Sequence, residues 1–565
     1  MNNKNNHATL LQRFLHWEHS TPDSIYLTQP LLDGSVEDFT WRQVGDQARR
    51  MAAHLQSLDF PAKSTIGIFG KNSAHWIIAD LAIWMAGHVS VPLYATAGAD
   101  TVKYVTEHAE LRLIFVGRLD GDSAGWRAAR EGVPVDLPLI ALPMSPCEDV
   151  PAWDRVIAHQ APLQALSVAR PGELATIIYT SGSTGNPKGV MHSFGAMFDA
   201  VDLSGCLYNG GQGPCSSDRL LSYLPLAHTA ERAVVESVSL YSGCRVFFNL
   251  GLETFGEDLR RARPTIFLSV PRLWSKFYQS IHERIPAAVQ AAAFADPLQA
   301  PAMKAQILGA LGLDQAHTGL SGSAPLPVAV LEWYRQLGLE LLEGYGMSEN
   351  FGISHFSVAS LVRVGYVGAS MPGVECRIGD NNEILVKSPA QMLGYFKQPE
   401  LTAESYTADG LFHTGDRGEL DECGRLRITG RVKELFKTAK GKYIAPVPIE
   451  ALLGNHPGIE ASCVTGVGLP QPFALLSVTP DVRARFASSE GQAAVADSLE
   501  QLLEQVNLQL EPHERLACLV VVDEPWSIGN GLLTPTLKIR RNPIEERHLG
   551  GAEDWVGSGS KVIFQ

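Results

Sequence analysis

The sequence has 565 residues, about four times the ~150 residues typical of one domain, which excludes a single small binding module. Hydrophobic residues make up 45% of it and charged residues 19%, so it can form large cores, and disorder is excluded as the dominant state. The 46 basic and 60 acidic side chains give a formal net charge of −14, which disfavours nonspecific binding to nucleic acid or anionic lipid.

Apolar runs bounded by Gly or Pro alternate with helical patterns from the N-terminal part of the chain onward. Thr65–Phe69 and Ala175–Tyr179 are typical of buried strands, whereas Trp76–Met85 is typical of a helix. Such alternation predicts an α/β protein whose large N-terminal domain consists of layered α/β subdomains.

The longest uncharged stretch, Leu81 to Ala99, contains Gly87 and Pro92, which suit a buried helix passing into a strand better than a membrane span. The first seven residues lack the basic start and apolar core of a secretory signal. We therefore expect a cytoplasmic protein without a transmembrane segment, and peripheral membrane contact stays open.

Residues 179–189, YTSGSTGNPKG, follow a predicted strand and have the composition of a phosphate-binding loop. Glycines let backbone N–H groups turn toward a ligand, hydroxyls add donors, and Lys188 supplies a positive charge. Gly189 after the lysine excludes the Walker pattern. The alternative, a flexible linker, requires neither the preceding strand nor a lone lysine. The candidate phosphate-binding residues are Thr180, Ser181, Gly182, Ser183, Thr184, Gly185 and Lys188.

This loop resembles that of the adenylate-forming (AMP-binding) superfamily, which includes acyl-CoA synthetases, firefly luciferase and the adenylation domains of peptide synthetases. Further motifs follow in the family's order over nearly the whole chain. The resemblance implies ATP, Mg²⁺ and coenzyme A as cofactors and co-substrates. It also implies that Thr184 and Glu349 are the metal ligands.

Two segments after the loop concern the acid to be activated. Residues 224–228, LPLAH, resemble the family segment whose aromatic or His side chain borders the carboxylate pocket, which makes His228 a candidate catalytic residue. The alternative for a histidine is a structural role. Residues 270–274, VPRLW, resemble the long-chain fatty acyl-CoA synthetase branch, although Trp274 suits core packing equally well.

Two further motifs resemble the family's nucleotide site. Residues 319–326, GLSGSAPL, resemble the turn against the adenine ring, and its candidate contacts are Ser323, Ala324 and Pro325. Residues 343–349 read EGYGMSE, and the candidate nucleotide contacts there are Glu343, Gly344, Tyr345, Gly346, Met347 and Ser348. The resemblance implies that Tyr345 stacks near adenine, Ser348 bonds the α-phosphate or the acid, and Glu349 ligates magnesium. One carboxylate with phosphate and water oxygens suits Mg²⁺.

The next motifs indicate ribose contacts and a domain boundary. Residues 410–416, GLFHTGD, resemble the segment whose aspartate, here Asp416, accepts hydrogen bonds from both ribose hydroxyls. Residues 430–434, GRVKE, resemble the family's ribose-contacting arginine, here Arg431, and its hinge; many members have Asp where Lys433 stands, so the pivot stays open. We expect a large domain over 1–430, a hinge over 431–434 and a small mobile α+β domain over 435–565.

The C-terminal domain carries two more motifs. Residues 436–446 resemble the element that lines the pantetheine tunnel, where Gly441 lets that arm of coenzyme A pass close to the backbone. Residues 533–541 resemble the motif that bears the catalytic lysine, here Lys538, in the Thr-Pro-Thr form of the long-chain branch. Between them, apolar residues at helical spacing predict a helix capped by Ser498, and Leu516–Val522 reads as a strand.

A carboxylate resists attack by a thiol, and joining it to the α-phosphate of ATP gives an acyl adenylate with a good leaving group. The site must then supply positive charge where two anions meet. The candidate catalytic residues are Lys188, His228, Ser348 and Lys538. We expect an AMP-forming acyl-CoA synthetase for a medium- to long-chain fatty acid. Alternatives are transfer to a carrier protein, lactone formation, activation of an aromatic or amino acid, or a noncatalytic nucleotide- or acyl-binding homologue.

Overall fold

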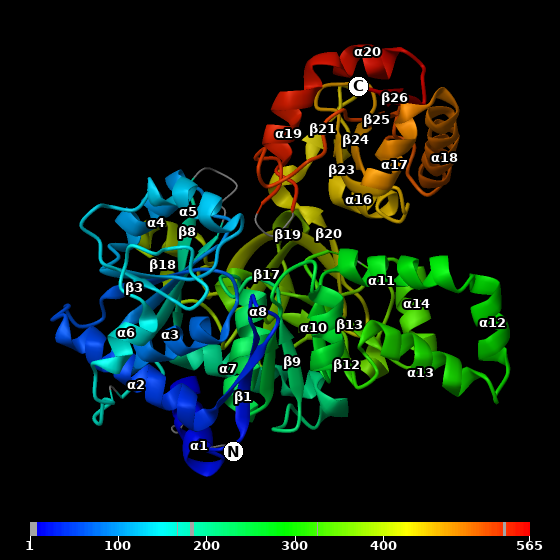
Figure 1. The fold of residues 1–565 in the computed structure, drawn as a ribbon. Helices are drawn as coiled ribbons and strands as arrows, with labels where there is room; N and C mark the ends of the chain where they lie inside the picture. The colour runs from blue at the N-terminus through cyan, green and yellow to red at the C-terminus, as the bar shows by residue number, and fades with distance from the viewer. Residues whose placement is uncertain (1–7, 167, 181–185, 325, 535–537) are drawn as a thin grey trace. The chain divides into compact units, whose positions relative to one another are not determined.

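The computed structural model describes residues 8–166, 168–180, 186–324, 326–534 and 538–565 (Figure 1). The chain forms two compact units. The first contains the chain up to Cys376 together with Val386–Phe412 and Cys423–Arg425, and the second contains the remaining segments up to Gln565. Because the second unit includes stretches before residue 430, the units are not two simple halves of the sequence. The boundaries predicted at 430 and 434 stay predictions.

The first unit contains a seven-stranded sheet that confirms the predicted α/β architecture. Its strands, in spatial order, are β18 (Gly394–Tyr395), β8 (Lys188–Ser193), β7 (Leu174–Thr180), β4 (Val89–Leu93), β3 (Thr65–Phe69), β5 (Leu113–Val116) and β6 (Leu139–Ala141). The strands from β7 to β6 are parallel, whereas β8 and β18 are antiparallel to their neighbours. Strands β3, β4 and β5 are buried along their whole length, which explains their continuous apolar sequence.

Two further sheets belong to the first unit. One has the order β2 (Val36–Thr40), β1 (Ile25–Pro30), β10 (Arg245–Phe248) and β9 (Arg219–Ser222). The other has the order β11 (Ile266–Ser269), β12 (Thr318–Gly322), β13 (Leu341–Tyr345), β14 (His355–Phe356) and β15 (Ala369–Ser370). Since β11, β12 and β13 are parallel, the chain leaves them at one common edge of the sheet.

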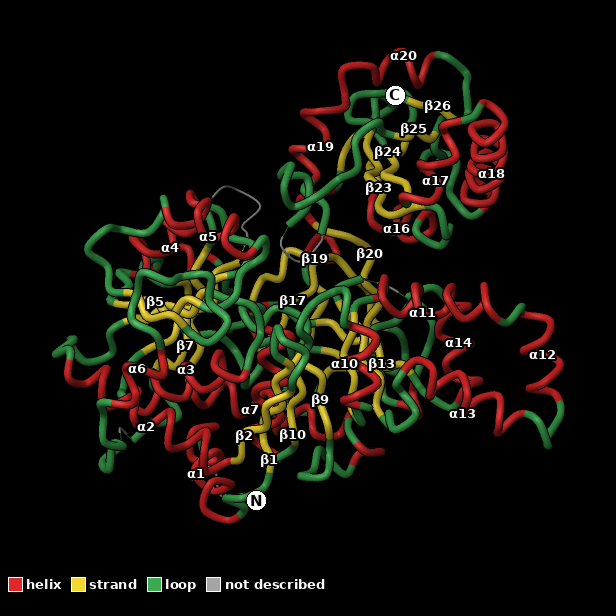
Figure 2. Tube along the Cα trace, viewed as in Figure 1, coloured by secondary structure: helices red, strands yellow, loops and turns green. Residues whose placement is uncertain are grey.

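The helices of this unit flank its sheets (Figure 2). They are α1 (Leu10–Ser20), α2 (Trp41–Ser57), α3 (Ala74–Met85), α4 (Ala99–Ala109), α5 (Asp122–Arg130), α6 (Trp153–Ala158), α7 (Phe194–Ser204), α8 (Thr229–Glu231), α9 (Val238–Ser242), α10 (Phe255–Ala262), α11 (Pro271–Arg284), α12 (Ala287–Ala295), α13 (Ala300–Leu311), α14 (Val328–Leu337) and α15 (Pro399–Glu404). A π-helix, Arg232–Ser237, joins α8 to α9.

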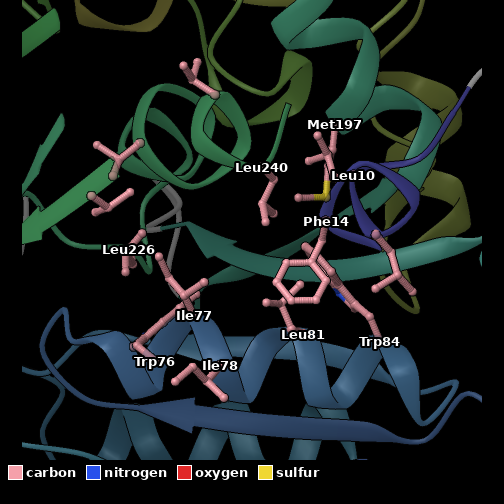
Figure 3. Packing of buried hydrophobic residues seen from close by; sticks show 14 of the residues in the cluster. Leu10, Phe14, Trp76, Ile77, Ile78, Leu81, Trp84, Met197, Leu226 and Leu240 are labelled. Carbon is pink, nitrogen blue, oxygen red and sulfur yellow. The ribbon is translucent and has the colours of Figure 1, made fainter. Parts of the chain in front are cut away.

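Helix α3 lies in the middle of the largest apolar core. The Ser73 hydroxyl caps it by accepting a hydrogen bond from the Trp76 backbone N–H at 3.2 Å, and every residue of the helix is buried. Figure 3 shows its apolar side chains packed with those of α1 and with Leu226, which lies two residues before His228. The core therefore extends to the predicted carboxylate-pocket segment.

The second unit contains most of the sheet β16 (Glu375–Ile378), β17 (Glu383–Lys387), β19 (Phe412–Leu420) and β20 (Leu426–Arg431). It also has the hairpin β21 (Phe436–Lys437) and β22 (Tyr443–Ile444), and the sheet β23 (Ile459–Thr465), β24 (Phe473–Val478), β25 (Leu519–Val521) and β26 (Val562–Phe564). Its helices are α16 (Pro446–Leu453), α17 (Pro480–Ala484), α18 (Ser489–Leu508), α19 (Arg541–His548) and α20 (Ala552–Gly557). The predicted α+β character of this region is confirmed.

One predicted helix start is wrong. Helix α18 begins nine residues before the expected cap, and Ser488 caps it through the backbone N–H of Gly491 at 3.1 Å. Ser498 lies inside the helix, where its hydroxyl bonds the His456 ring at 3.0 Å. Among the described residues, no helix combines the length and the apolar character needed to cross a bilayer.

Candidate functional site

The predicted phosphate loop connects two paired strands of the first unit. Thr180 ends β7 and Lys188 begins β8, and the two residues are direct partners in the antiparallel ladder. The strand pairing therefore fixes Lys188 at the base of the loop. The candidate residues Ser181, Gly182, Ser183, Thr184 and Gly185 lie outside the described residues, as does Pro325.

Lys188 and Glu349 both contact Tyr395. The Lys188 ammonium lies over the Tyr395 ring, 5.1 Å from its centroid, and the Tyr395 hydroxyl donates to Glu349 Oε1 at 2.7 Å. Burial and the Glu349 carboxylate raise the pKa of Tyr395, so the phenol keeps its proton and acts as the donor. The structure thus brings the loop lysine and the predicted metal ligand into one site.

Ser348 links the EGYGMSE motif to the LPLAH segment. Its hydroxyl accepts a hydrogen bond from the Thr229 hydroxyl at 3.0 Å, and its carbonyl accepts one from Nε2 of His192 at 2.7 Å. Burial lowers the pKa of His192 to about 3, which leaves the imidazole neutral and suited to donate this bond. His228 caps α8 through Nδ1, which accepts from the Ala230 N–H at 3.2 Å.

The backbone before His228 is held by two polar side chains, the half-buried Asn72 and the buried Glu231. The Asn72 side-chain carbonyl accepts from the Leu226 N–H at 2.9 Å, and Glu231 Oε1 accepts from the Tyr223 N–H at 2.9 Å. Burial raises the pKa of Glu231 to about 8, so the carboxyl is mostly protonated at neutral pH. These hydrogen bonds hold the backbone of the segment that leads to His228. They therefore help to fix the position of the His228 Cα, from which the half-buried side chain extends.

Glu343 ties the predicted adenine turn to β13. Its Oε1 accepts from the Leu326 N–H at 3.0 Å, and burial raises its pKa to about 7. Ser323, in the same turn, is exposed and has φ +72°, a conformation that costs a non-glycine residue free energy. At Gly346, a Cβ would lie 2.1 Å from the Gly352 carbonyl oxygen, so only glycine fits this close approach.

The rest of the EGYGMSE motif lies beside this turn. Gly344 is in β13, where a Cβ would lie 2.1 Å from the Phe356 ring, and Tyr345 is buried with its ring centroid 6.1 Å from that of His355. The Met347 N–H donates to the Asn350 side-chain carbonyl at 3.0 Å. Ala324 is exposed.

In the second unit, Asp416 and Arg431 are partners across β19 and β20, and Arg431 Nε donates to Asp416 Oδ1 at 3.1 Å. The pKa of Lys538 is lowered because surrounding protein atoms displace water and Arg431 repels the ammonium, while Asp416 opposes the shift. Both predicted ribose contacts thus act electrostatically on the predicted catalytic lysine.

Gly441 lies in the turn of the β21–β22 hairpin with φ +77°, a conformation that favours glycine. Among the described residues, a Cβ there would lie within 4 Å of the Lys437 side chain alone, at 3.7 Å, so they leave space beside the backbone of Gly441. This geometry is compatible with the close passage of a thin ligand arm.

Some residues around the site were not predicted from the sequence. Tyr395, His192 and Asn72 come from distant positions without a local pattern, whereas Thr229 directly follows LPLAH and could have been included with it. Trp274, which belongs to the segment that resembles the long-chain branch and suited core packing equally well, is fully buried and donates through Nε1 to the Leu320 carbonyl at 3.2 Å.

The residues present fit a magnesium ion shared with a phosphate ligand. The half-buried Glu349 carboxylate uses Oε1 for the Tyr395 hydroxyl, which leaves Oε2 for a cation. In the described part of the chain, no group of three or more His, Cys, Asp or Glu side chains could hold a metal by itself. A single carboxylate beside phosphate oxygens matches the usual coordination of Mg²⁺ in nucleotide sites.

Comparison with known proteins identifies the family of this chain. Residues 14–396 match the AMP-binding enzymes, and residues 434–545 match the C-terminal domain of AMP-binding enzymes. The chain is 31% identical to long chain acyl-CoA synthetase 6, peroxisomal, of Arabidopsis thaliana, over 95% of this chain and 85% of the relative. It is 29% identical to long-chain-fatty-acid–CoA ligase FadD15 of Mycobacterium bovis, over 95% of each chain.

The fold also matches solved structures. The adenylation domain of a carboxylic acid reductase from Segniliparus rugosus, in complex with AMP and a co-purified carboxylic acid, superimposes with a TM-score of 0.79 at 23% identity, over 97% of this chain and 94% of that one. At this identity the likeness supports the fold. Together with the family matches over both parts of the chain, it shows that this protein belongs to the AMP-binding enzyme family.

Proposed function

We propose that the protein joins a medium- to long-chain fatty acid to AMP and then to coenzyme A, with release of pyrophosphate and AMP. The observation that carries this proposal is the meeting of Lys188, Ser348 and Glu349 in one site of the first unit, from segments more than 150 residues apart. The two relatives named above, a long chain acyl-CoA synthetase and a long-chain-fatty-acid–CoA ligase, support the choice of acid and thiol.

In the first step, a carboxylate oxygen of the acid attacks the α-phosphorus of ATP, and the bond to pyrophosphate breaks. Two anions must approach each other, so the chain must supply positive charge where they meet. Lys188 lies at the base of the phosphate loop, and the Ser348 hydroxyl, already bonded to Thr229, can orient an oxygen of the acid or the α-phosphate. His228 borders the acid in this arrangement.

Glu349 would hold Mg²⁺, which when bound supplies further positive charge beside the phosphates. In the second unit, Asp416 accepts hydrogen bonds from the ribose hydroxyls beside Arg431, and Lys538 supplies the additional charge for the first step. We infer that Asp416, Arg431 and Lys538 act together, because Arg431 pairs with Asp416 and both charges shift the pKa of Lys538.

In the second step, the sulfur of coenzyme A attacks the acyl carbon, the bond to AMP breaks, and the thiol proton leaves to solvent. The thiol must approach from a side that the departing pyrophosphate has vacated. We infer that rotation about residues 431–434 removes Lys538 and presents Gly441, whose turn has space above its backbone.

The test is a series of free fatty acids of increasing chain length, assayed with ATP and coenzyme A for pyrophosphate, AMP and thioester. We expect all three products with medium and long chains. AMP-linked acid without thioester would favour a carrier protein or lactone route, and ATP binding without any pyrophosphate release would favour a noncatalytic homologue.

A further inference from the structure

One aromatic ring contacts both opposite charges of the first-unit site. The Lys188 ammonium lies 5.1 Å from the centroid of the Tyr395 ring, and the hydroxyl of the same ring donates to Glu349 Oε1 at 2.7 Å. No ion pair joins Lys188 to Glu349 within 4.0 Å in the parts of the chain that the structure describes. Lys188 and Glu349 each contact Tyr395 and do not form an ion pair with each other.

Strand pairing fixes the backbone of Tyr395, and burial restricts its ring. Tyr395 pairs with Val190 in the β18–β8 ladder, only two residues from Lys188 along β8, and its N–H donates to the Thr402 hydroxyl at 2.9 Å. Tyr395 is 5% exposed. On the other side, the Glu349 carbonyl accepts from the Met392 N–H at 2.7 Å, which ties the backbone of Glu349 to the segment that leads into β18. The backbones of Lys188, Glu349 and Tyr395 are therefore held next to one another by bonds within the chain.

Contact with a ring and contact with a carboxylate have different consequences for Lys188. An ammonium over a ring face keeps its N–H donors available for phosphate oxygens, whereas a direct ion pair would occupy them. In the same way, the phenol hydroxyl occupies one oxygen of Glu349 and leaves the other for a cation. A direct Lys188–Glu349 pair would withhold both charges from the nucleotide and its metal ion.

We propose that Tyr395 is a positioning residue that keeps Lys188 and Glu349 apart, so that one charge receives phosphate and the other receives the metal ion. This assignment rests on the proposed function, because it takes a metal–triphosphate as the ligand of the site. It assigns two separable tasks to one side chain: the ring separates the charges, and the hydroxyl orients the carboxylate.

The test uses Tyr395→Phe, which keeps the ring, and Tyr395→Leu, which removes it. Calorimetry with ATP in excess EDTA measures nucleotide binding without metal, and electron paramagnetic resonance measures Mn²⁺ binding to the ATP-loaded protein. We expect Tyr395→Phe to change metal-free ATP affinity less than twofold while weakening Mn²⁺ binding by about 10- to 100-fold, the usual range for loss of a group that orients a metal ligand.

Tyr395→Leu should also weaken metal-free ATP binding, by roughly tenfold, because Lys188 can then pair with Glu349. Glu349→Gln removes the charge that would capture Lys188. In the Glu349→Gln background, Tyr395→Leu should therefore change metal-free ATP affinity less than threefold. This double-mutant cycle measures the separating role directly.

Tyr241→Phe is the matched control, because the Tyr241 hydroxyl also donates to a carboxylate, that of Asp202, at 2.9 Å. It should leave both affinities unchanged. The proposal is overturned if Tyr395→Phe binds Mn²⁺ like the parent protein, or if Tyr395→Leu has the same effect with and without the Glu349 charge. A parent protein that binds no ATP, with or without metal, overturns the proposed function as well, whereas failure of the variants alone overturns only the role of Tyr395.

Discussion

Arg431 Nε donates to Asp416 Oδ1 at 3.1 Å, between residues that face each other across β19 and β20. The Asp416 side chain is 14% exposed and that of Arg431 is 54% exposed. The arginine therefore orients a mostly buried carboxylate from its solvent side, and a carboxylate held in one orientation can accept two hydrogen bonds from a ribose diol.

Asp416→Ala should weaken ATP binding by roughly 10- to 100-fold, the range expected for loss of hydrogen bonds to a charged acceptor. Calorimetry with ATP and with 2′,3′-dideoxy-ATP measures the effect. If Asp416 holds the ribose hydroxyls, the variant should bind both nucleotides equally, and the parent protein should prefer ATP. An undiminished preference for ATP in the variant would falsify the assignment.

Lys538→Ala should separate the two half-reactions. We expect pyrophosphate release to fall by about 10²- to 10³-fold, as is usual when one group that stabilises developing charge is removed, while a supplied acyl adenylate is still converted to thioester. Lys561→Ala is the control, because Lys561 is a half-exposed lysine of the same unit that pairs with Glu504. Full adenylation by Lys538→Ala would exclude the catalytic role.

The pH dependence of the first half-reaction gives a second measure of Lys538. Its lowered pKa means that the ammonium loses its proton at a lower pH than an ordinary lysine. Pyrophosphate release should therefore decline as the pH rises toward 10.5, and the decline should begin below that value. The residual rate of Lys538→Ala should lack this decline.

Glu231→Gln should change how stability depends on pH. Burial raises the pKa of Glu231 from 4.5 to about 8, so the folded state binds its proton more tightly than the unfolded state. This group therefore lowers the free energy of unfolding as the pH rises from about 4.5 to about 8. The glutamine keeps an acceptor for the Tyr223 N–H and does not titrate.

Thermal unfolding at pH 5 and pH 8 measures this effect. We expect the variant to gain stability relative to the parent protein at pH 8, by on the order of a few kcal/mol, and to gain little at pH 5. An equal difference at the two pH values would show that the Glu231 carboxyl does not titrate in this range.

Arg232 is fully buried between two acids, with Nε 2.8 Å from Glu236 Oε2 and the Asp80 carboxylate bonded to its other end. Arg232→Met should destabilise the first unit by about 3–5 kcal/mol near pH 8, because it leaves buried carboxyls without their cation. The loss should shrink at pH 5, since burial raises the pKa of both acids and they can protonate.

Arg42→Met is the control for this prediction. Arg42 pairs with Asp23 at 3.0 Å, but both side chains are more than 60% exposed, so this pair should contribute less than about 1 kcal/mol. Chemical denaturation followed by tryptophan fluorescence distinguishes the two cases. Equal losses for the two variants would contradict the role assigned to the buried pair.

Elements with a local apolar pattern were predicted closely. The predicted strand Thr65–Phe69 is β3, and the phosphate loop lies between the paired ends of β7 and β8, because a strand, a glycine-rich turn and a strand are neighbours in the chain. The start of α18 was missed because residues 489–496 are mostly small or polar and show no apolar periodicity. Its cap is Ser488, which stands before that stretch.

The sequence by itself determined the order of the motifs, the α/β class and the family, since these follow from residue types at short spacing. Only the tertiary structure decided that Tyr395 stands beside Lys188 and Glu349, and that Asn72 and Glu231 hold the backbone before His228. Their positions lie up to about 200 residues apart, and strand pairing and burial bring them together. No local pattern encodes such contacts, because they depend on how sheets and helices pack.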